Sequence, residues 1–179
     1  SDEYSVQSAI GQGTNNFTVS QLNRYVAAVA NRGTVYKLTL LDKTTDVNGK
    51  VIKEYEPEVT NTIDDISDNT WNLLHQGMIA MVQDMSQFNG MEISMAGKTG
   101  TAQQSEVHPD HVLFVGFAPA ENPEIAVAVR IANGYSSAYT AEIGRDIVKS
   151  YYKTSDSDKL VIGKAAQLGA VTRSEERRV

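Results

Sequence analysis

One short stretch, from Met95 to Gln103, gathers the residues of this chain that are best suited to chemistry. Its sequence, Met-Ala-Gly-Lys-Thr-Gly-Thr-Ala-Gln, places an ammonium, two hydroxyls and two glycines inside a run that is otherwise typical of a strand. Because side chains alternate along an extended chain, we expect Lys98 and Gly100 on one face and Thr99 and Thr101 on the other. Gly100 weakens a strand and carries no side chain, which indicates that another molecule approaches its backbone closely.

Such a strand edge could hold an acyl substrate in three ways. The ammonium and hydroxyls would bind a carboxylate, the backbone would pair with a peptide-like ligand, and a backbone N–H could stabilise an oxyanion. An ordinary exposed strand end is the alternative for so short a motif. A phosphate-binding loop is excluded, because that motif requires glycine at position 92, which is Glu92, and the residues that follow continue as a strand.

The composition limits the class of protein. A chain of 179 residues can form one domain with a real core, and its 41% apolar and 21% charged residues are ordinary for a globular protein. The net charge of −6 argues against a general nucleic-acid role. The absence of cysteine excludes disulfides, zinc ribbons and thiol catalysis. No apolar run is long enough to span a membrane and no signal peptide opens the chain, so an export signal would lie on other residues.

The first half of the chain predicts a helix and a hairpin. Thr18 to Gln21 has the form of a capping box, apolar residues follow at helical spacing to Ala30, and Asn31-Arg32-Gly33 stops the helix. The stretch from Thr34 to Leu41 is β-rich, Asn48-Gly49 predicts a hairpin turn, and a return strand covers Val51 to Tyr55. The hairpin offers no obvious chemistry and is interpreted as scaffold.

The second half predicts an antiparallel sheet flanked by helices, an α/β (α+β) fold. Ser67-Asp68-Asn69 is expected to cap a helix whose inward stripe consists of Trp71, Leu74, Met78, Met81, Val82 and Met85. Together with the Lys98 strand, the β-rich runs 112–117 and 125–131 predict a three-stranded meander buried on both faces. A closing helix is expected over Thr140 to Tyr152, with inward residues Ile143, Ile147, Val148 and Tyr151. The polar stretch 154–179 is interpreted as a solvated tail.

The histidines predict no metal centre. His108 and His111 flank Pro109-Asp110, but no partner pair of ligands accompanies them, and a structural metal needs about four ligands. His75 is expected to pack within its helix or to face solvent. We predict no cofactor.

The order of these elements carries more information than any single motif. A turn at Gly11-Gln12-Gly13 leads into the capped helix, and the strands carry the sequences Ala-Gly-Lys-Thr-Gly-Thr-Ala (96–102), His-Val-Leu-Phe-Val-Gly-Phe-Ala-Pro (111–119) and Ile-Ala-Val-Ala-Val (125–129). Over Ser8 to Lys153 this resembles the C-terminal part of the penicillin-binding transpeptidase domain, most closely its class B members. A serine β-lactamase or β-lactam sensor domain shares Lys-Thr-Gly without these surroundings, and a non-catalytic peptide-binding module is the alternative of another class.

The resemblance implies roles for the Lys98 strand. Lys98 would maintain positive potential in the active site. The hydroxyls of Thr99 and Thr101 would hold the carboxylate of a D-alanyl-D-alanine terminus or a β-lactam, and Gly100 would lie against the bound substrate. The N–H of Thr101 would be half of an oxyanion hole. Residues 1–153 would form the C-terminal portion of a transpeptidase domain in a membrane-anchored parent protein. That parent would work on peptidoglycan in cell-wall synthesis and cell shape, at the extracytoplasmic face of the bacterial membrane.

Two motifs of that family are expected to be missing. The family places Ser-x-x-Lys, with the nucleophile, and Ser-x-Asn before the Gly-Gln-Gly turn. We interpret Ser67-Asp68-Asn69 as a helix cap and Ser150 to Lys153 as a chance match that falls after the Lys-Thr-Gly strand. The chain alone is therefore predicted to be a soluble, inactive piece of a transpeptidase. Its expected partners are stem peptides, β-lactams, and either the missing part of the domain or another copy, with no nucleic acid.

Overall fold

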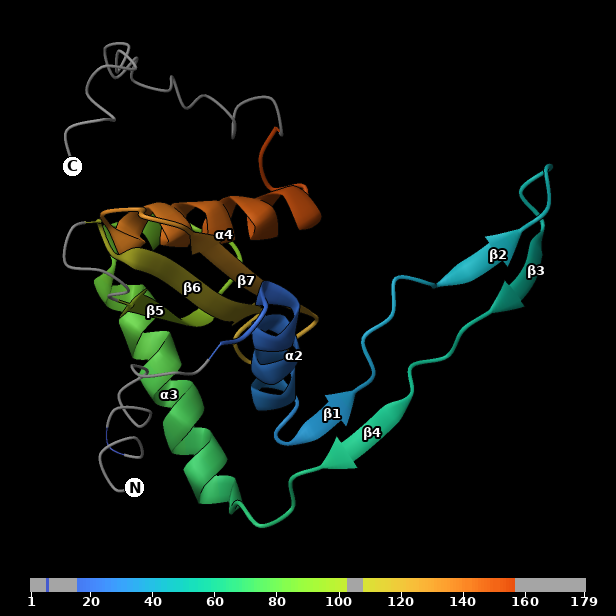
Figure 1. The fold of residues 1–179 in the computed structure, drawn as a ribbon, viewed down its shortest axis with the longest axis horizontal. Helices are drawn as coiled ribbons and strands as arrows, with labels where there is room; N and C mark the ends of the chain where they lie inside the picture. Colours follow the sequence, from blue (N-terminus) through green and yellow to red (C-terminus); the bar gives the residue numbers. More distant parts are fainter. Residues whose placement is uncertain (1–5, 7–15, 103–107, 157–179) are drawn as a thin grey trace.

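A three-stranded antiparallel sheet lies at the centre of the fold, in the order β5 (Ala96–Ala102), β6 (His111–Ala118) and β7 (Ile125–Ile131). Three helices cover it, namely α2 (Val19–Ala30), α3 (Asp68–Asp84) and α4 (Ser137–Tyr151) (Figure 1). The structure, a computed structural model, describes residues 6, 16–102 and 108–156. The α+β class with its antiparallel sheet is confirmed.

The helix α2 begins and ends as the sequence predicts. The N–H of Gln21 donates to Thr18 Oγ1 at 3.1 Å, and the N–H of Thr18 donates to Gln21 Oε1 at 2.8 Å, which completes the capping box. After Ala30 the chain turns at Gly33, whose φ is 105°. A Cβ at Gly33 would lie 2.4 Å from the carbonyl oxygen of Ile63, so glycine is required by both its conformation and its packing.

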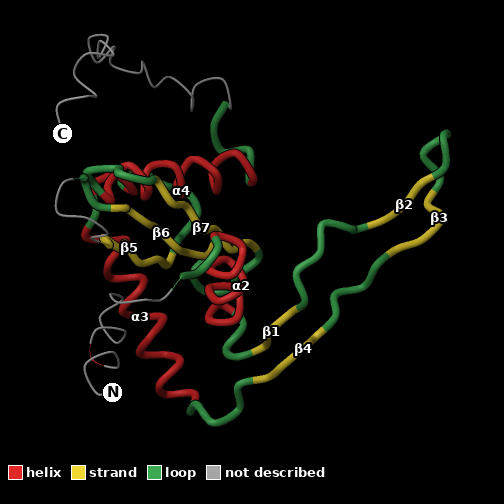
Figure 2. The backbone as a smooth tube through the Cα atoms, viewed as in Figure 1, coloured by secondary structure: helices red, strands yellow, loops and turns green. Residues whose placement is uncertain are grey.

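The predicted hairpin is one end of a longer ribbon that starts after α2 and extends away from the central sheet (Figures 1 and 2). Its turn is confirmed, with Gly49 at φ 84°, and it joins β2 (Lys43–Thr45) to β3 (Val51–Glu54). The strand expected over Thr34 to Leu41 is shorter, because β1 ends at Tyr36 and pairs with an unpredicted strand, β4 (Val59–Thr62). No described element packs on Leu40, which is fully exposed, so strand-like sequence alone did not make a strand there.

The helix α3 starts at the predicted cap, where Ser67 Oγ accepts the N–H of Thr70 at 3.2 Å. Its inward stripe differs at one position, because Leu74 is 40% exposed and His75 is buried instead. The Nε2–H of His75 donates to the carbonyl of Val29 at 2.9 Å, and its ring packs against Phe117 with centroids 5.0 Å apart. The hydrogen bond to Val29 on α2 satisfies the ring N–H, so His75 can be buried in the core.

The helix α4 packs through small residues, and its predicted inward face is wrong at three of four positions. Val148 is buried, whereas Ile143, Ile147 and Tyr151 are exposed. The buried residues are Thr140, Ala141, Gly144 and Val148. At Gly144 a Cβ would lie 2.5 Å from the ring of Phe114, so the helix turns this side toward the sheet because only a glycine lets it approach so closely.

Among the described residues, no helix has the length and apolar character needed to cross a membrane.

A polar clasp ties the start of β5 to the turn between β6 and β7. The N–H of Ala120 donates to the carbonyl of Ser94 at 3.2 Å and to its Oγ at 3.1 Å, while the Ser94 hydroxyl donates to the Glu121 carboxylate. The hydrogen bond from Ser94, followed by one from the backbone of Glu121, holds the pKa of this carboxyl below its ordinary value of 4.5. The charged form of Glu121 is therefore the one that the fold prefers.

This clasp predicts a pH dependence of stability. A carboxyl with a lowered folded-state pKa stabilises the fold above its unfolded value, and that contribution is lost as the pH falls through the folded value. The free energy of unfolding should therefore decrease below pH 4.5, and the Ser94→Ala variant should show a smaller decrease. Denaturant unfolding as a function of pH measures both. The exposed carboxyl of Glu92 provides a control, since Glu92→Gln should retain the wild-type slope, and an unchanged slope in Ser94→Ala would contradict the assignment.

Candidate active-site strand

The residues of the Lys-Thr-Gly stretch lie on β5, at one edge of the sheet. The strand pairs with β6 along its whole length, from Ala96 opposite Phe117 to Ala102 opposite His111. Within the part of the chain that the structure describes, no strand pairs with the other side of β5. Among the described residues, the backbone of β5 therefore has no strand partner on that side, where an extended ligand could pair with it.

The side chains of β5 alternate across the sheet. Gly97 lies against the ring of Phe114 on the side covered by α4, whereas Ala96 packs in the cluster formed with α2 and α3. Thr99 and Thr101 therefore share the α4 side with Gly97, and Lys98 lies on the opposite side. The two hydroxyls are thus two residues apart on one face, about 7 Å along the strand, a spacing at which both can reach one carboxylate.

The Lys98 ammonium is exposed and lies close to its own strand. Its Nζ donates to the carbonyl of Thr99 at 2.7 Å. None of the carboxylates in the described residues forms a salt bridge with it. The positive charge is consequently not neutralised within the described chain and remains available to an anionic ligand.

The two glycines of β5 differ in their surroundings. A Cβ at Gly97 would lie 2.6 Å from Phe114 Cζ, closer than real side chains approach, so Gly97 is required for packing. A Cβ at Gly100 would meet Leu113 at an ordinary 3.7 Å, so the fold does not require glycine there. The absence of a side chain at Gly100 thus agrees with the interpretation that a ligand approaches this part of the strand.

Neither lookalike of the missing motifs forms a nucleophilic pair. Ser67 is the N-cap of α3, and its Oγ accepts the N–H of Thr70. Ser150 lies in the last turn of α4, but Lys153 follows the helix end and has a φ of 55°, so the two residues do not lie on one helical face. In the described ranges, histidine and acidic residues do not gather in groups of three or more that could hold a metal.

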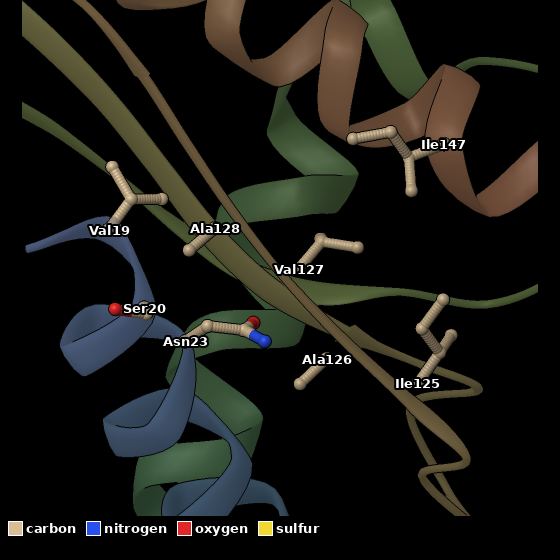
Figure 3. Close-up of a pocket in the computed structure, with 8 residues that line it drawn as sticks. All are labelled: Val19, Ser20, Asn23, Ile125, Ala126, Val127, Ala128 and Ile147. Carbon is tan, nitrogen blue, oxygen red and sulfur yellow. The ribbon is translucent and has the colours of Figure 1, made fainter. Parts of the chain in front are cut away.

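A groove at the other edge of the sheet was not predicted. It has a volume of about 340 Å³ and is lined by α2, β7 and α4 through Val19, Ser20, Asn23, residues 125–128 and Ile147 (Figure 3). The Asn23 side chain points from α2 toward β7, and its buried Oδ1 has no hydrogen-bond partner among the described residues. Ile147, which the sequence pattern predicts to be in the core, lines this groove. Its apolar side chain at helical spacing was the sequence feature that could have indicated a covered surface here.

Comparison with known proteins found one family model and several relatives that match this chain. Residues 1–149 match the family model of the penicillin binding protein transpeptidase domain. The chain is 32% identical over 169 residues to penicillin-binding protein 2B of Streptococcus pneumoniae, covering 83% of this chain and 24% of that protein. It is 31% identical over 156 residues to the peptidoglycan D,D-transpeptidase MrdA of Acinetobacter baumannii, covering 78% and 23% respectively. The chain thus spans about a quarter of the length of these relatives.

Solved structures agree with the sequence comparison. The structure of penicillin-binding protein 2B from S. pneumoniae strain R6 matches with a TM-score of 0.75 at 30% identity, over 86% of this chain and 27% of that one. An imipenem acyl-enzyme complex of penicillin-binding protein A from M. tuberculosis matches with a TM-score of 0.72 at 26% identity, over 82% and 33%.

The glycines of β5 provide a matched pair of substitutions. Gly97→Ala should lower the free energy of unfolding by about 1–3 kcal/mol, because the methyl group must displace the Phe114 ring in a packed core. Gly100→Ala should leave it unchanged or raise it by up to about 1 kcal/mol, because alanine restricts the unfolded chain and meets only ordinary contacts. Chemical denaturation of both variants measures the difference, and equal losses of stability would contradict the packing assigned to Phe114.

Proposed function

The chain belongs to the penicillin-binding protein transpeptidase family, and we propose that it forms one wall of the active site of a peptidoglycan D,D-transpeptidase. The observation that carries the proposal is the open edge of β5, a strand that carries Lys98 on one face and Thr99 and Thr101 on the other. An ammonium, two hydroxyls on one face and unpaired backbone groups suit a peptide that ends in a carboxylate.

In the proposed complex, the stem peptide lies along β5 with its terminal carboxylate at the hydroxyls of Thr99 and Thr101. Lys98 contributes positive potential, and the N–H of Thr101 donates to the carbonyl oxygen of the penultimate D-alanine. A serine hydroxyl attacks that carbonyl carbon while a base takes its proton. The base then passes this proton to the nitrogen as the C–N bond breaks, which releases D-alanine and leaves an acyl-serine ester. An amine of a neighbouring stem then attacks the ester, forms the new amide and returns the serine. An oxyanion donor of this kind accounts for about 10²–10³ in rate.

The nucleophile of the proposed enzyme comes from a segment outside these 179 residues. Ser67 serves as a helix cap and Ser150 lacks a lysine on its helical face, so neither is assigned to acyl transfer. Without a serine nucleophile there is no covalent route, and the chain alone is proposed to be inactive. The parent would be anchored at the extracytoplasmic face of the bacterial membrane, where peptidoglycan is assembled.

The groove at β7 is the proposed docking place for that part of the domain. The outer side of β7 pairs with no described strand, and the groove walls at Val19, Val127 and Ile147 are apolar. An extended segment could pair with β7, cover these side chains and supply the hydrogen-bond donor that Asn23 Oδ1 lacks among the described residues. A segment of the same domain is favoured over a second copy, because the chain covers only about a quarter of its relatives.

Intact mass spectrometry with a reactive penicillin tests the proposed enzyme. The chain alone should gain no adduct, whereas the same chain joined to a segment that carries Ser-x-x-Lys and Ser-x-Asn should gain one. The Thr101→Val variant of the joined protein should acylate more slowly, since it loses a carboxylate ligand. A stoichiometric adduct on the chain alone would contradict the assignment of the nucleophile, and no adduct on the joined protein would contradict the enzyme.

The proposed docking predicts that Asn23→Leu changes the free energy of unfolding in opposite directions in the chain alone and in the joined protein. In the chain alone, Asn23→Leu should raise the free energy of unfolding, because a buried acceptor without a partner costs about 1–3 kcal/mol. In the joined protein the same substitution should lower it, because the donor of the docked segment would then be the unpaired group. Ser20→Ala, at the same groove, is the control and should show no such reversal. Effects of the same sign in both proteins would contradict the proposed docking.

A further inference from the structure

The sequence contains asparagine followed by glycine at three places, and the structure puts the three pairs in different settings. They are Asn48-Gly49, Asn89-Gly90 and Asn133-Gly134. Asparagine is a thermolabile residue, and a following glycine makes it more so, because no Cβ shields the glycine nitrogen from the asparagine side chain. Since the pairs have the same two side chains, we expect their surroundings in the folded chain to decide how fast each one reacts.

The reaction in question is deamidation. The glycine nitrogen attacks Cγ of the asparagine and loses its proton, the bond between Cγ and the side-chain nitrogen breaks, and ammonia leaves with that proton. Water then opens the resulting succinimide ring at either carbonyl, which gives an aspartyl or an isoaspartyl residue. Attack requires the peptide plane between the two residues to turn until its nitrogen faces Cγ. Contacts that hold this plane therefore slow the reaction.

The pair Asn133-Gly134, in the loop between β7 and α4, is held on both sides. The N–H of Gly134 donates to the carbonyl of Asp110 at 3.0 Å, and the N–H of Asn133 donates to Nδ1 of His111 at 3.1 Å. Gly134 is buried, and a Cβ there would lie 2.3 Å from Val112 Cγ2. Turning this peptide plane would break the hydrogen bond of Gly134 and disturb a packed contact.

The pair Asn48-Gly49, at the tip of the ribbon, has one hydrogen bond that opposes the turn. The N–H of Gly49 donates to the carbonyl of Asp46 at 3.1 Å. Both residues of the pair are exposed, and a Cβ built on Gly49 would have no described atom beyond its chain neighbours within 4 Å. The peptide plane can therefore turn once that hydrogen bond opens.

The pair Asn89-Gly90, in the stretch between α3 and β5, is the least restrained of the three. Among the described residues, neither the carbonyl of Asn89 nor the N–H of Gly90 has a hydrogen-bond partner. Both residues are exposed, and a Cβ built on Gly90 would also have no described atom beyond its chain neighbours within 4 Å. From the present ψ of 133° at Asn89, the peptide plane can turn without loss of a hydrogen bond or of packing.

We propose that Asn89 is a site of spontaneous deamidation, with water as the only co-reactant, and that the fold protects Asn133 from the same reaction. The product carries a new carboxylate, and its isoaspartyl form adds a carbon to the main chain just before the Ser94 clasp and β5. The proposal depends on the contacts of the described residues and is independent of the proposed function.

Ageing of the full 179-residue chain at mildly alkaline pH tests the proposal, with peptide mass spectrometry to locate each deamidated residue. In the folded chain, Asn89 should react fastest. Asn48 should react about fivefold more slowly because one ordinary hydrogen bond must open first, and Asn133 more than about tenfold more slowly because packing must yield as well. In denaturant the three rates should converge, since nothing then holds the peptide planes. Asn89→Ser is the control and should leave the rates at Asn48 and Asn133 unchanged.

Three results would overturn the proposal. In the folded chain, a rate at Asn89 no higher than the rate at Asn133 would show that the fold does not protect the latter. A faster reaction at Asn48 than at Asn89 would contradict the assignment of Asn89. The same ratios of rates in denaturant as in the folded chain would show that the neighbouring sequence, and not the fold, sets the reactivity.

Discussion

The ring of Phe114 sets the distances on which the rest of the fold depends. It is fully buried and lies against glycines of three elements, Gly97 on β5, Gly116 on β6 and Gly144 on α4. A Cβ at Gly97 or Gly144 would meet the ring within 2.6 Å, so the helix and the edge strand approach each other only because these positions lack side chains. Since packed interiors deform little, this ring sets how closely α4 approaches β5, the strand that carries Lys98 and Thr99.

The sheet that this ring holds together is open at both edges within the described residues, and the two edges differ in chemistry. The β5 edge carries a charge, hydroxyls and a replaceable glycine, as expected for a surface that binds and releases a ligand. The β7 edge is bordered by apolar side chains and by the buried Asn23 Oδ1, an acceptor that no described residue pairs with. An unpaired buried acceptor destabilises a fold, so it fits a permanently covered interface better than a transient one.

The sequence predicted those features that depend on local rules. The capping box at Thr18, the stop at Gly33, the turn at Gly49 and the cap at Ser67 each need only neighbouring residues, and all four are present. The order and pairing of the three central strands followed from their apolar runs. Lys98 to Thr101 could be placed together because they are contiguous, although their proposed roles came from resemblance to a family.

The features that escaped prediction depend on contacts between distant segments. The inward face of α4 is rotated because Phe114, thirty residues earlier, requires Gly144 beneath it, a constraint invisible to helical periodicity. His75 lies in the core because the Val29 carbonyl on another helix accepts a hydrogen bond from its ring N–H. The hydrogen bond from Asn133 to His111 has the same origin, since β6 and the loop after β7 meet only once the meander has formed. Polar pairs of this kind have no periodic signal, yet they fix backbone conformations that apolar packing leaves free. The Ser94 clasp does so at the start of the candidate active-site strand.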